Sequence, residues 1–558
     1  MAGVLLSLMS VALLLFFYHD LFWWPVDEGV YAYIAQRMNA GDIIHKDIID
    51  LHAGYGNLLN AWAFHLFGED LLSLRYPLIA ITLVQSIIAY ILLASRGPFV
   101  ACVGGIAVAA FSFVQFPNPS ANWHALGWFF VLALCLEKLR PGSMLRLFLA
   151  GLLVGMCFFT RQLSGVFLAL GLICVLLVEA PKEQDNPRGP ALLIGAIASL
   201  GLILYVATKD QLSAFLWAGI WPLGLLITAT LTARFSWRYA GRTVVLVLAG
   251  FLIAGLPLAI SNLSKDAFGF WLNDMLFSAL SIHGQDFIAQ ASFWNLLQMA
   301  WQGMLSGAGL VASLSGLAWI FLILTVPALG IIVNRDVTHV QRCSPTAILA
   351  VFWAIGALHY QIPIYLMFVL PAVLCALLIL RGTFALSVIV LAVALWAIAF
   401  QAGQPVERGL TGIVAGERRG PPVRAELPGV SLRLMPDDIA DFETLLKELE
   451  RTGSDDAHLM TIPVEPQLYF MTNRTPPVRY FSTAMGLLSD ADVTNTITAL
   501  DEAAPLNVVN RRFDKYLTPL SAQLLDHVKA HSEAPFQVGP FDVYRYAPEA
   551  ASTSALEQ

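Results

Sequence analysis

Long apolar segments recur along the whole chain and constrain its fold more than any other feature. A helix that spans a membrane needs roughly 20 mostly apolar residues. Thirteen segments are candidates for such helices: residues 2–19, 73–94, 98–115, 121–136, 144–160, 163–179, 190–207, 212–231, 243–261, 306–333, 346–359, 363–380 and 383–400. Only 13% of the 558 residues are charged, against about 25% in a soluble domain. We therefore expect a polytopic α-helical membrane protein.

Lysines and arginines are distributed unequally between the loops that join these segments. One set of alternate loops carries most of them: Arg96, Lys138, Arg140, Arg146, Lys182, Arg188, Arg234, Arg238, Arg242, Arg335, Arg342 and Arg381. The other short loops carry only Arg161 and Lys209. Because loops rich in Lys and Arg stay in the cytoplasm, we expect a bacterial inner-membrane protein with a cytoplasmic N-terminus. No basic block or stripe is present, so we expect no nucleic-acid partner.

The same bias divides the chain into a membrane part and outward parts. Residues 1–400 form the predicted transmembrane domain, with two long outward loops at 20–72 and 262–305. The second loop mixes acids, His283 and aromatic residues, which fits an interfacial helix pair with a lid role or an aromatic belt at the membrane surface. Residues 401–558 form a predicted linker followed by a periplasmic C-terminal domain.

This C-terminal region has the pattern of a small α/β domain. Residues 401–436 are rich in Pro, Gly and Arg, as a linker would be. Two amphipathic helices and three strands are predicted after them: helices at Ile439–Arg451 and Ser521–Ala530, and strands at His458–Val464, Pro505–Asn510 and Phe541–Tyr546.

The first outward loop is predicted to contain two short amphipathic helices. One begins near Glu28 and ends at Gly41, and the other covers Leu58–Phe67 and ends at Gly68. Helices with one apolar face beside a bilayer lie in the plane of the interface. They would hold the loop at the depth of a lipid phosphate.

Four acidic residues of this loop are candidate catalytic residues: Asp27, Glu28, Asp47 and Asp50. A positioned carboxylate can take the proton of an acceptor hydroxyl. Carboxylate oxygens also bind hard divalent cations, so Asp27 and Glu28 are candidate ligands of Mg, Mn or Ca. The structural alternative is that Asp27 caps a helix and Glu28 stabilises its first turn.

Basic and aromatic side chains near the outward face are candidates for binding a phosphate or a sugar. They are His45, Lys46, His52, Tyr55, Arg75, His124, Arg161, His283 and His359. Arginine offers a planar fork to phosphate and lysine a point charge. Structural alternatives stay open: Arg161 as an arginine that extends to the interface, Arg75 as an anchor at a helix start, and His124 and His359 as interfacial histidines.

The first loop resembles that of the GT-C glycosyltransferases, in the branch of the protein O-mannosyltransferases and the lipid A aminoarabinose transferases. The residues that carry the resemblance are Asp27, Glu28, Tyr31, Ala32, Ile34, Ala35, Gly41, Asp47, Asp50, Leu66, Phe67, Gly68, Leu71, Leu74 and Arg75. Residues Pro466–Tyr480 also resemble a stretch of the C-terminal domains of bacterial members.

The resemblance implies the GT-C fold and an activity. The enzyme would move a sugar from a polyprenyl-phosphate donor to a lipid, glycan or protein acceptor, and we expect a monomer. By position, Asp27 would be the base or a metal ligand, Glu28 its partner, and Arg161 a ligand of the donor phosphate. The sequence after the second acid, Asp50-Leu51-His52-Ala53-Gly54, departs from the family pattern. Whether Asp47 or Asp50 is equivalent, and whether His52 replaces a phosphate-binding lysine, stays open.

Two alternatives belong to other functional classes. A transporter or flippase of lipid-linked sugars would place ionisable residues near the middle of the bilayer, whereas the predicted spans here are almost free of charge. A non-catalytic assembly partner with this fold would not need Asp27 and Glu28, which are both present. The sequence therefore favours the transferase.

Overall fold

The computed structural model describes residues 2–180, 187–209, 212–278, 292–305, 309–340, 343–401, 421–453, 456–512 and 516–548. By their contacts, the residues divide into two compact units. The first unit takes residues 1–19, 78–259 and 290–419, and the second takes 20–77, 260–289 and 420–558. The second unit thus combines most of the predicted first outward loop, part of the second one, and the C-terminal region.

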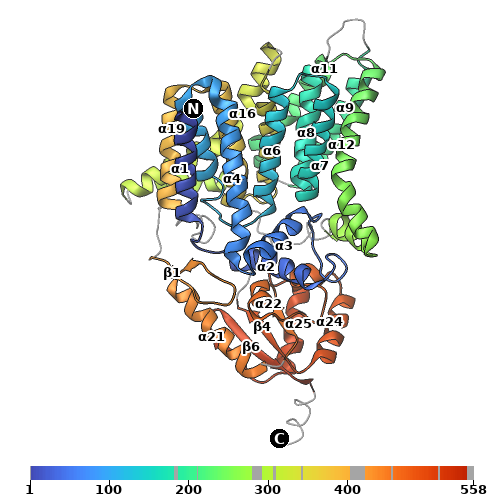
Figure 1. Cartoon of the computed structure of the whole chain (residues 1–558), viewed down its shortest axis with the longest axis vertical. Helices are drawn as coiled ribbons and strands as arrows, with labels where there is room; N and C mark the ends of the chain where they lie inside the picture. Colours follow the sequence, from blue (N-terminus) through green and yellow to red (C-terminus); the bar gives the residue numbers. More distant parts are fainter. Residues whose placement is uncertain are drawn as a thin grey trace, which may run out of the picture. The chain divides into compact units, whose positions relative to one another are not determined.

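The first unit consists of apolar helices, many of which run side by side (Figure 1). Its elements are α1 (Ala2–Tyr18), α4 (Leu71–Leu93), η1 (Ala94–Arg96), α5 (Pro98–Ala110), α6 (Ala121–Lys138), α7 (Met144–Thr160), α8 (Gln162–Glu179), α9 (Gly189–Ala207), α10 (Leu212–Ala214), η2 (Phe215–Gly219), α11 (Ile220–Thr232), α12 (Trp237–Ser264), α15 (Phe293–Leu305), α16 (Leu310–Val340), α17 (Pro345–Trp353), η4 (Ala354–Leu358), α18 (Pro363–Arg381), α19 (Phe384–Trp396) and η5 (Ala397–Gln401). Two of these helices, α4 and α12, are shared with the second unit.

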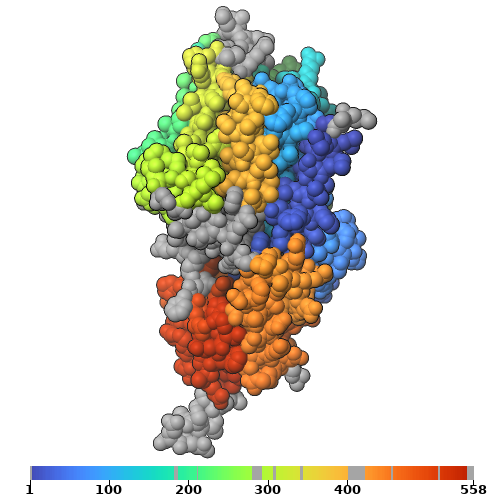
Figure 2. Space-filling model, turned by 90° about the vertical axis from the view of Figure 1, so that its left-hand side faces the viewer, coloured from blue at the N-terminus to red at the C-terminus, as the bar shows by residue number. Residues whose placement is uncertain are grey.

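Each of the thirteen predicted spans coincides with helix in this list. Within the described residues, seven helices are long and apolar enough to cross a membrane, and five further apolar helices are shorter. Apolar side chains such as Leu324 of α16 and Leu395 of α19 are exposed in the bundle, where lipid would cover them. Figure 2 shows these two helices, in yellow and gold, side by side on its surface. The chain is a multi-pass membrane protein, as predicted.

Small residues allow several of these helices to approach closely. A side chain added at Gly151 of α7 would lie 2.0 Å from the backbone oxygen of Val247 in α12. Helices in lipid associate through such close contacts, because apolar burial alone gives them little advantage there. In contrast, α18 is buried along almost its whole length and packs against α5, α6, α16 and α17. It forms the centre of the bundle.

The second unit is built on a mixed sheet of four strands in the order β3-β4-β6-β5. The strand β3 (Leu459–Ile462) runs parallel to β4 (Leu506–Arg511), while β6 (Phe541–Tyr546) is antiparallel to both β4 and β5 (Phe536–Val538). A separate ribbon joins β1 (Val423–Arg424) to β2 (Arg433–Leu434). The helices of the unit are α2 (Pro25–Ala40), α3 (Tyr55–Phe67), α13 (Phe268–Leu272), η3 (Asn273–Ser278), α21 (Pro436–Gly453), α22 (Pro466–Thr472), α23 (Thr483–Gly486), α24 (Asp490–Ala503) and α25 (Pro519–Ala530).

The predicted helices and strands of the first loop and the C-terminal region are confirmed, but the sequence did not predict β1, β2, β5, α22, α23 and α24. The predicted linker at 401–436 is wrong for its described end, because β1 and β2 pair there and Leu432 is buried in a core. Alternation along β4 places Val508 and Val509 in two different cores, because successive strand residues point to opposite faces. The core that contains Val509 also contains Ile34 of α2 and Phe64 of α3. The loop helices therefore belong to the same packed body as the C-terminal sheet.

Candidate functional site

Helix α2 presents the Asp27–Glu28 pair from its first turn. Trp24 is the N-cap residue and Pro25 follows it, which suits a helix start because proline has no N–H to leave unpaired. Asp27 is exposed and Glu28 is buried. The backbone N–H of Trp24 donates to Glu28 Oε2 at 2.8 Å. The predicted N-cap role of Asp27 is therefore wrong, since Trp24 holds that position.

Glu28 forms a fully buried ion pair with Arg75 of α4. Arg75 donates to Glu28 Oε1 from Nε at 3.0 Å and from Nη2 at 2.8 Å. The same guanidinium donates to the backbone oxygens of Leu21, at 3.0 Å, and Phe22. Burial raises the pKa of Glu28, while the charge of Arg75 opposes that rise. Arg75 thereby fixes the start of the first loop, as its structural alternative described.

Asp50 and Asp47 lie in different surroundings. Asp50 is buried and accepts from Asn57 Nδ2 at 2.5 Å, with His52 Nδ1 at 3.1 Å from its other oxygen. Burial acts to raise the pKa of Asp50, but the neighbouring His52 and His45 and the amide of Asn57 together lower it. Asp47 is exposed, and its carboxylate accepts from the backbone N–H of Ile43 at 2.7 Å. Asp47 therefore stabilises a turn, whereas Asp50 is a buried and charged acceptor.

A third group joins the first loop to two distant parts of the chain. His45 is buried in the left-handed backbone region at φ +72°, and its Nδ1 lies 3.5 Å from Asp274 Oδ2. Arg479 Nη2 donates to both oxygens of Asp274, at 2.6 and 2.7 Å. Nearby, Trp271 Nε1 donates to the backbone oxygen of Ala53 at 2.9 Å. The carboxylate of Asp274 thus lies between the imidazole of His45 and the guanidinium of Arg479, which come from segments more than 200 residues away on either side in the sequence.

Sequence reasoning missed Asp274 and Arg479 as site residues. Asp274 was visible as an acid of the second loop, and Arg479 lies in the stretch that resembles family C-terminal domains. Neither observation predicts that the two residues form an ion pair, because ion pairs between distant residues follow no sequence period.

Two further candidates lie in the same unit. Lys46 is partly exposed in the turn that follows Ile43. Tyr55 begins α3, and partial burial raises the pKa of its hydroxyl. The unit therefore gathers Asp27, Glu28, His45, Lys46, Asp47, Asp50, His52, Tyr55 and Arg75.

The remaining candidates are elsewhere. Arg161 lies in the first unit between α7 and α8, and its Nη1 donates to Ser164 Oγ at 2.8 Å. His124 is buried in α6 of that unit, and the ring of His359 packs at a tilt of 47° against Tyr360, with 4.1 Å between ring centroids. His283 lies outside the described residues. Roles for these side chains stay predictions.

The predicted divalent metal receives no support from the donor set. Among the described residues, no three His, Cys, Asp or Glu side chains group as metal ligands. Both oxygens of Glu28 already accept hydrogen bonds, from Arg75 and Trp24. The Asp27–Glu28 pair as arranged does not fit a cation that needs several oxygen ligands.

Comparison with known proteins shows similarity at the level of structure. No protein-family model and no curated protein matches the sequence. The chain is similar to ArnT from Cupriavidus metallidurans bound to undecaprenyl phosphate, with 13% identity, a TM-score of 0.52 and 97% of each chain covered. Apo ArnT from the same organism matches with 13% identity, a TM-score of 0.41 and 98% of each chain covered. The Archaeoglobus fulgidus oligosaccharyltransferase in complex with Zn and sulfate matches with 12% identity and a TM-score of 0.42, over 98% of this chain and 73% of that one. The match to the first of these structures shows that the chain has the GT-C fold, as the loop resemblance predicted.

Proposed function

We propose that this chain is a membrane glycosyltransferase that moves a sugar from a polyprenyl-phosphate donor to a lipid, glycan or protein acceptor on the periplasmic side of a bacterial inner membrane. The observation that carries the proposal is the fold shared over 97% of both chains with ArnT, whose structure contains undecaprenyl phosphate. The polar first loop, with its buried and exposed acids, supports a site for chemistry there.

Asp27 is the proposed base. Its carboxylate is exposed, so an acceptor can reach it. The adjacent Glu28 is buried in its ion pair with Arg75. Asp27 would take the acceptor's proton while the acceptor oxygen bonds to the sugar's anomeric carbon. The bond from that carbon to the phosphate oxygen breaks, and polyprenyl phosphate leaves with the electron pair. Glu28 would act by positioning, since its ion pair fixes the turn that carries Asp27.

Asp50 is the better supported candidate for the second acid. His52 and Asn57 hold its carboxylate in one orientation, and its lowered pKa keeps it ionised at neutral pH. A fixed negative charge of this kind can stabilise the positive charge that develops on the sugar. Asp47 closes a turn instead.

The donor phosphate needs cationic hydrogen-bond donors. Arg161 donates one hydrogen bond to Ser164, and a guanidinium has five N–H groups, so further donors remain for a phosphate. Lys46 and His52 are partly exposed beside Asp47 and Asp50. We assign these three side chains to the phosphate as part of the same proposal.

The replacement Asp27→Asn tests the base. It keeps the shape of the side chain but cannot take a proton, so transfer from a polyprenyl-phosphate sugar should fall by a factor of roughly 10²–10⁴. The measurement is product formation by purified protein with a panel of polyprenyl-phosphate sugars. Asp526→Asn, at another exposed aspartate (78% exposed), is the matched control and should leave transfer unchanged. Full activity of Asp27→Asn, in protein that purifies like the wild type, would refute the assignment.

A further inference from the structure

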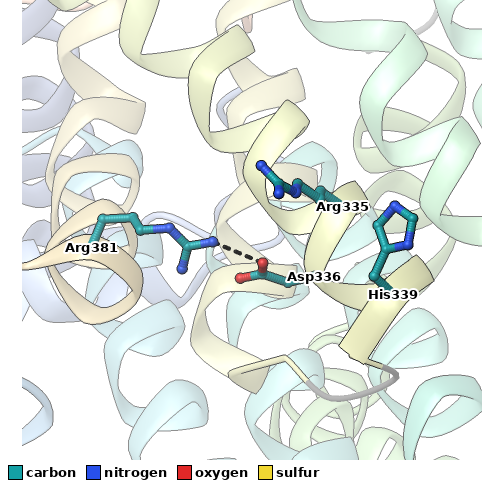
Figure 3. A pocket seen from close by; sticks show the side chains of 4 residues that line it. All are labelled: Arg335, Asp336, His339 and Arg381. Atoms are coloured by element: carbon teal, nitrogen blue, oxygen red, sulfur yellow. Dashed lines mark hydrogen bonds and ion pairs between the residues drawn. The ribbon is translucent and has the colours of Figure 1, made fainter.

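A hollow in the first unit is lined by the C-terminal ends of two membrane helices. It has a volume of about 400 Å³ and is lined by Arg335, Asp336 and His339 of α16 and Arg381 of α18 (Figure 3). Arg381 Nη2 donates to Asp336 Oδ1 at 2.8 Å. Arg335 and His339 have no hydrogen-bond or ion-pair partner in the described part of the chain. Two arginines against one aspartate give the hollow a net positive charge.

Helix lengths place this hollow at the edge of the hydrocarbon layer. The 19 residues of α18 rise about 28 Å at 1.5 Å per residue, close to the roughly 30 Å of a bilayer core. Arg381 is the last residue of that helix. The 31 residues of α16 rise about 46 Å, so its final turn extends beyond the core into the headgroup layer.

One face of α16 changes from apolar to basic as it approaches the hollow. Leu317, Leu324 and Ile331 follow each other at intervals of seven residues and are 54%, 46% and 54% exposed. Arg335 and His339, both exposed, continue this face, because residues four apart lie on the same side of a helix. An acyl chain along the apolar stretch would therefore place its headgroup beside the two basic residues.

A second basic hollow is also lined by the end of α18. It has a volume of about 200 Å³, and its lining includes Arg96, Glu137, Lys138 and Ile379. Arg96 Nη2 donates to the backbone oxygen of Leu380 at 3.4 Å. Basic residues of four loops that the positive-inside rule assigns to the cytoplasm thus line hollows at the end of α18: Arg96, Lys138, Arg335 and Arg381. On that side anionic lipids attract basic groups.

We propose that the hollow lined by Arg335, Asp336, His339 and Arg381 binds the headgroup of an anionic phospholipid of the cytoplasmic leaflet. Arg335 and Arg381 would hold the phosphate through charge-assisted hydrogen bonds, with His339 at its side. Asp336 keeps Arg381 directed into the hollow through their ion pair. The lipid's acyl chain would lie on Leu317, Leu324 and Ile331. This site does not depend on the proposed transferase activity.

The test measures how much phosphatidylglycerol and phosphatidylcholine stays bound to the purified protein, by native mass spectrometry. The wild-type protein should retain more phosphatidylglycerol than phosphatidylcholine. Losing the charge-assisted hydrogen bonds of one guanidinium to the bound phosphate weakens binding about tenfold. Arg335→Gln, which leaves the Arg381–Asp336 pair intact, should therefore weaken retention about tenfold, and Arg335→Gln/Arg381→Gln roughly 100-fold. Phosphatidylcholine retention should not change.

Arg238→Gln/Arg242→Gln is the matched control. Both arginines are exposed on α12, belong to the same set of predicted cytoplasmic loops, and lie outside the hollow. This variant removes the same charge and should retain phosphatidylglycerol like the wild type. The proposal is overturned if both double variants lose lipid equally or if neither loses any. It is also overturned if inorganic phosphate displaces the lipid at millimolar concentration, because the site would then recognise phosphate rather than a lipid.

Discussion

At the scale of single residues, the two aspartates of the 43–50 turn show how burial decides what a carboxylate does. Asp50 accepts from two side chains within a buried pocket of polar groups, and Asp47 accepts from a backbone N–H at the surface. Removing a buried, hydrogen-bonded charge costs about 1–3 kcal/mol, while surface substitutions mostly stay within about 0.5 kcal/mol.

Asp50→Asn should therefore destabilise the protein at neutral pH, and the difference from wild type should depend on pH in a defined direction. The folded pKa of Asp50 is below its ordinary value of 3.8, so the unfolded chain binds this proton more readily. The stabilisation is fully present above about pH 4 and is lost as the pH falls through the lowered folded pKa. Thermal midpoints of wild type and variant should converge in that acidic range. Asp47→Asn is the control, and a loss of stability as large as that of Asp50→Asn would contradict this account.

At the scale of elements, helices α2 and α22 pack backbone against backbone. A methyl group at Gly29 would lie 2.4 Å from the backbone nitrogen of Gln467 and 2.7 Å from its Cα. Contacts this short cannot be relieved by a rotamer change, because they involve the backbone. The two helices must separate to admit any side chain there.

Gly29→Ala should consequently destabilise the second unit by about 1–3 kcal/mol, as overpacking does, and reduce transfer by displacing Asp27. Gly56→Ala is the matched control: Gly56 lies in α3, and a methyl group there would have no atom within 4 Å. Because alanine is the better helix former, this control should be neutral or more stable by about 0.5–1 kcal/mol. Thermal unfolding and transfer rates measure both, and equal behaviour of the two variants would refute the close packing.

Helices and their ends were predictable where neighbouring residues in the sequence determine them. The ends of α2 and α3 follow from Gly41 and Gly68, both at positive φ, a conformation that glycine adopts without strain. Helix α24 was missed although Ser489 caps it and Val493 and Leu500 repeat along its buried face. The ion pairs could not be predicted from the sequence, because Glu28 and Arg75 are 47 residues apart and Asp274 and Arg479 are 205 apart. Such pairs form only once tertiary packing brings their elements together.

At the scale of the whole molecule, the membrane helices were predictable from length and apolarity alone, but the composition of the second unit was not. Its core takes Trp23 and Phe64 from the first loop, Phe442 from α21 and Phe470 from α22. Hydropathy separates apolar spans from polar loops, yet it does not say which polar segments share a core. The sequence therefore predicted residues 401–558 as a C-terminal domain of their own. That domain boundary stays a prediction.

A chain that ends at residue 401 should keep the described membrane helices, which all lie before that point. It would lose the partners of Trp23, Tyr33 and Phe64, so residues 20–77 should lose their packing and the transferase should be inactive. Limited proteolysis and hydrogen exchange of this loop, compared with the full chain, measure the effect. Equal protection in both proteins would show that the loop folds by itself.

The shared core of the second unit also sets an order of events during synthesis. Ribosomes add roughly 5–20 residues per second, and several hundred residues separate the first loop from α21 and α22. On the order of tens of seconds therefore pass between synthesis of the loop and synthesis of the helices that it packs against. Contacts over so long a separation form slowly even then, because closing the loop between them has an entropic cost. The packing of the acidic loop is thus completed late in the synthesis of each chain, and under the proposed function a nascent chain that stalls after the membrane helices would lack transfer activity.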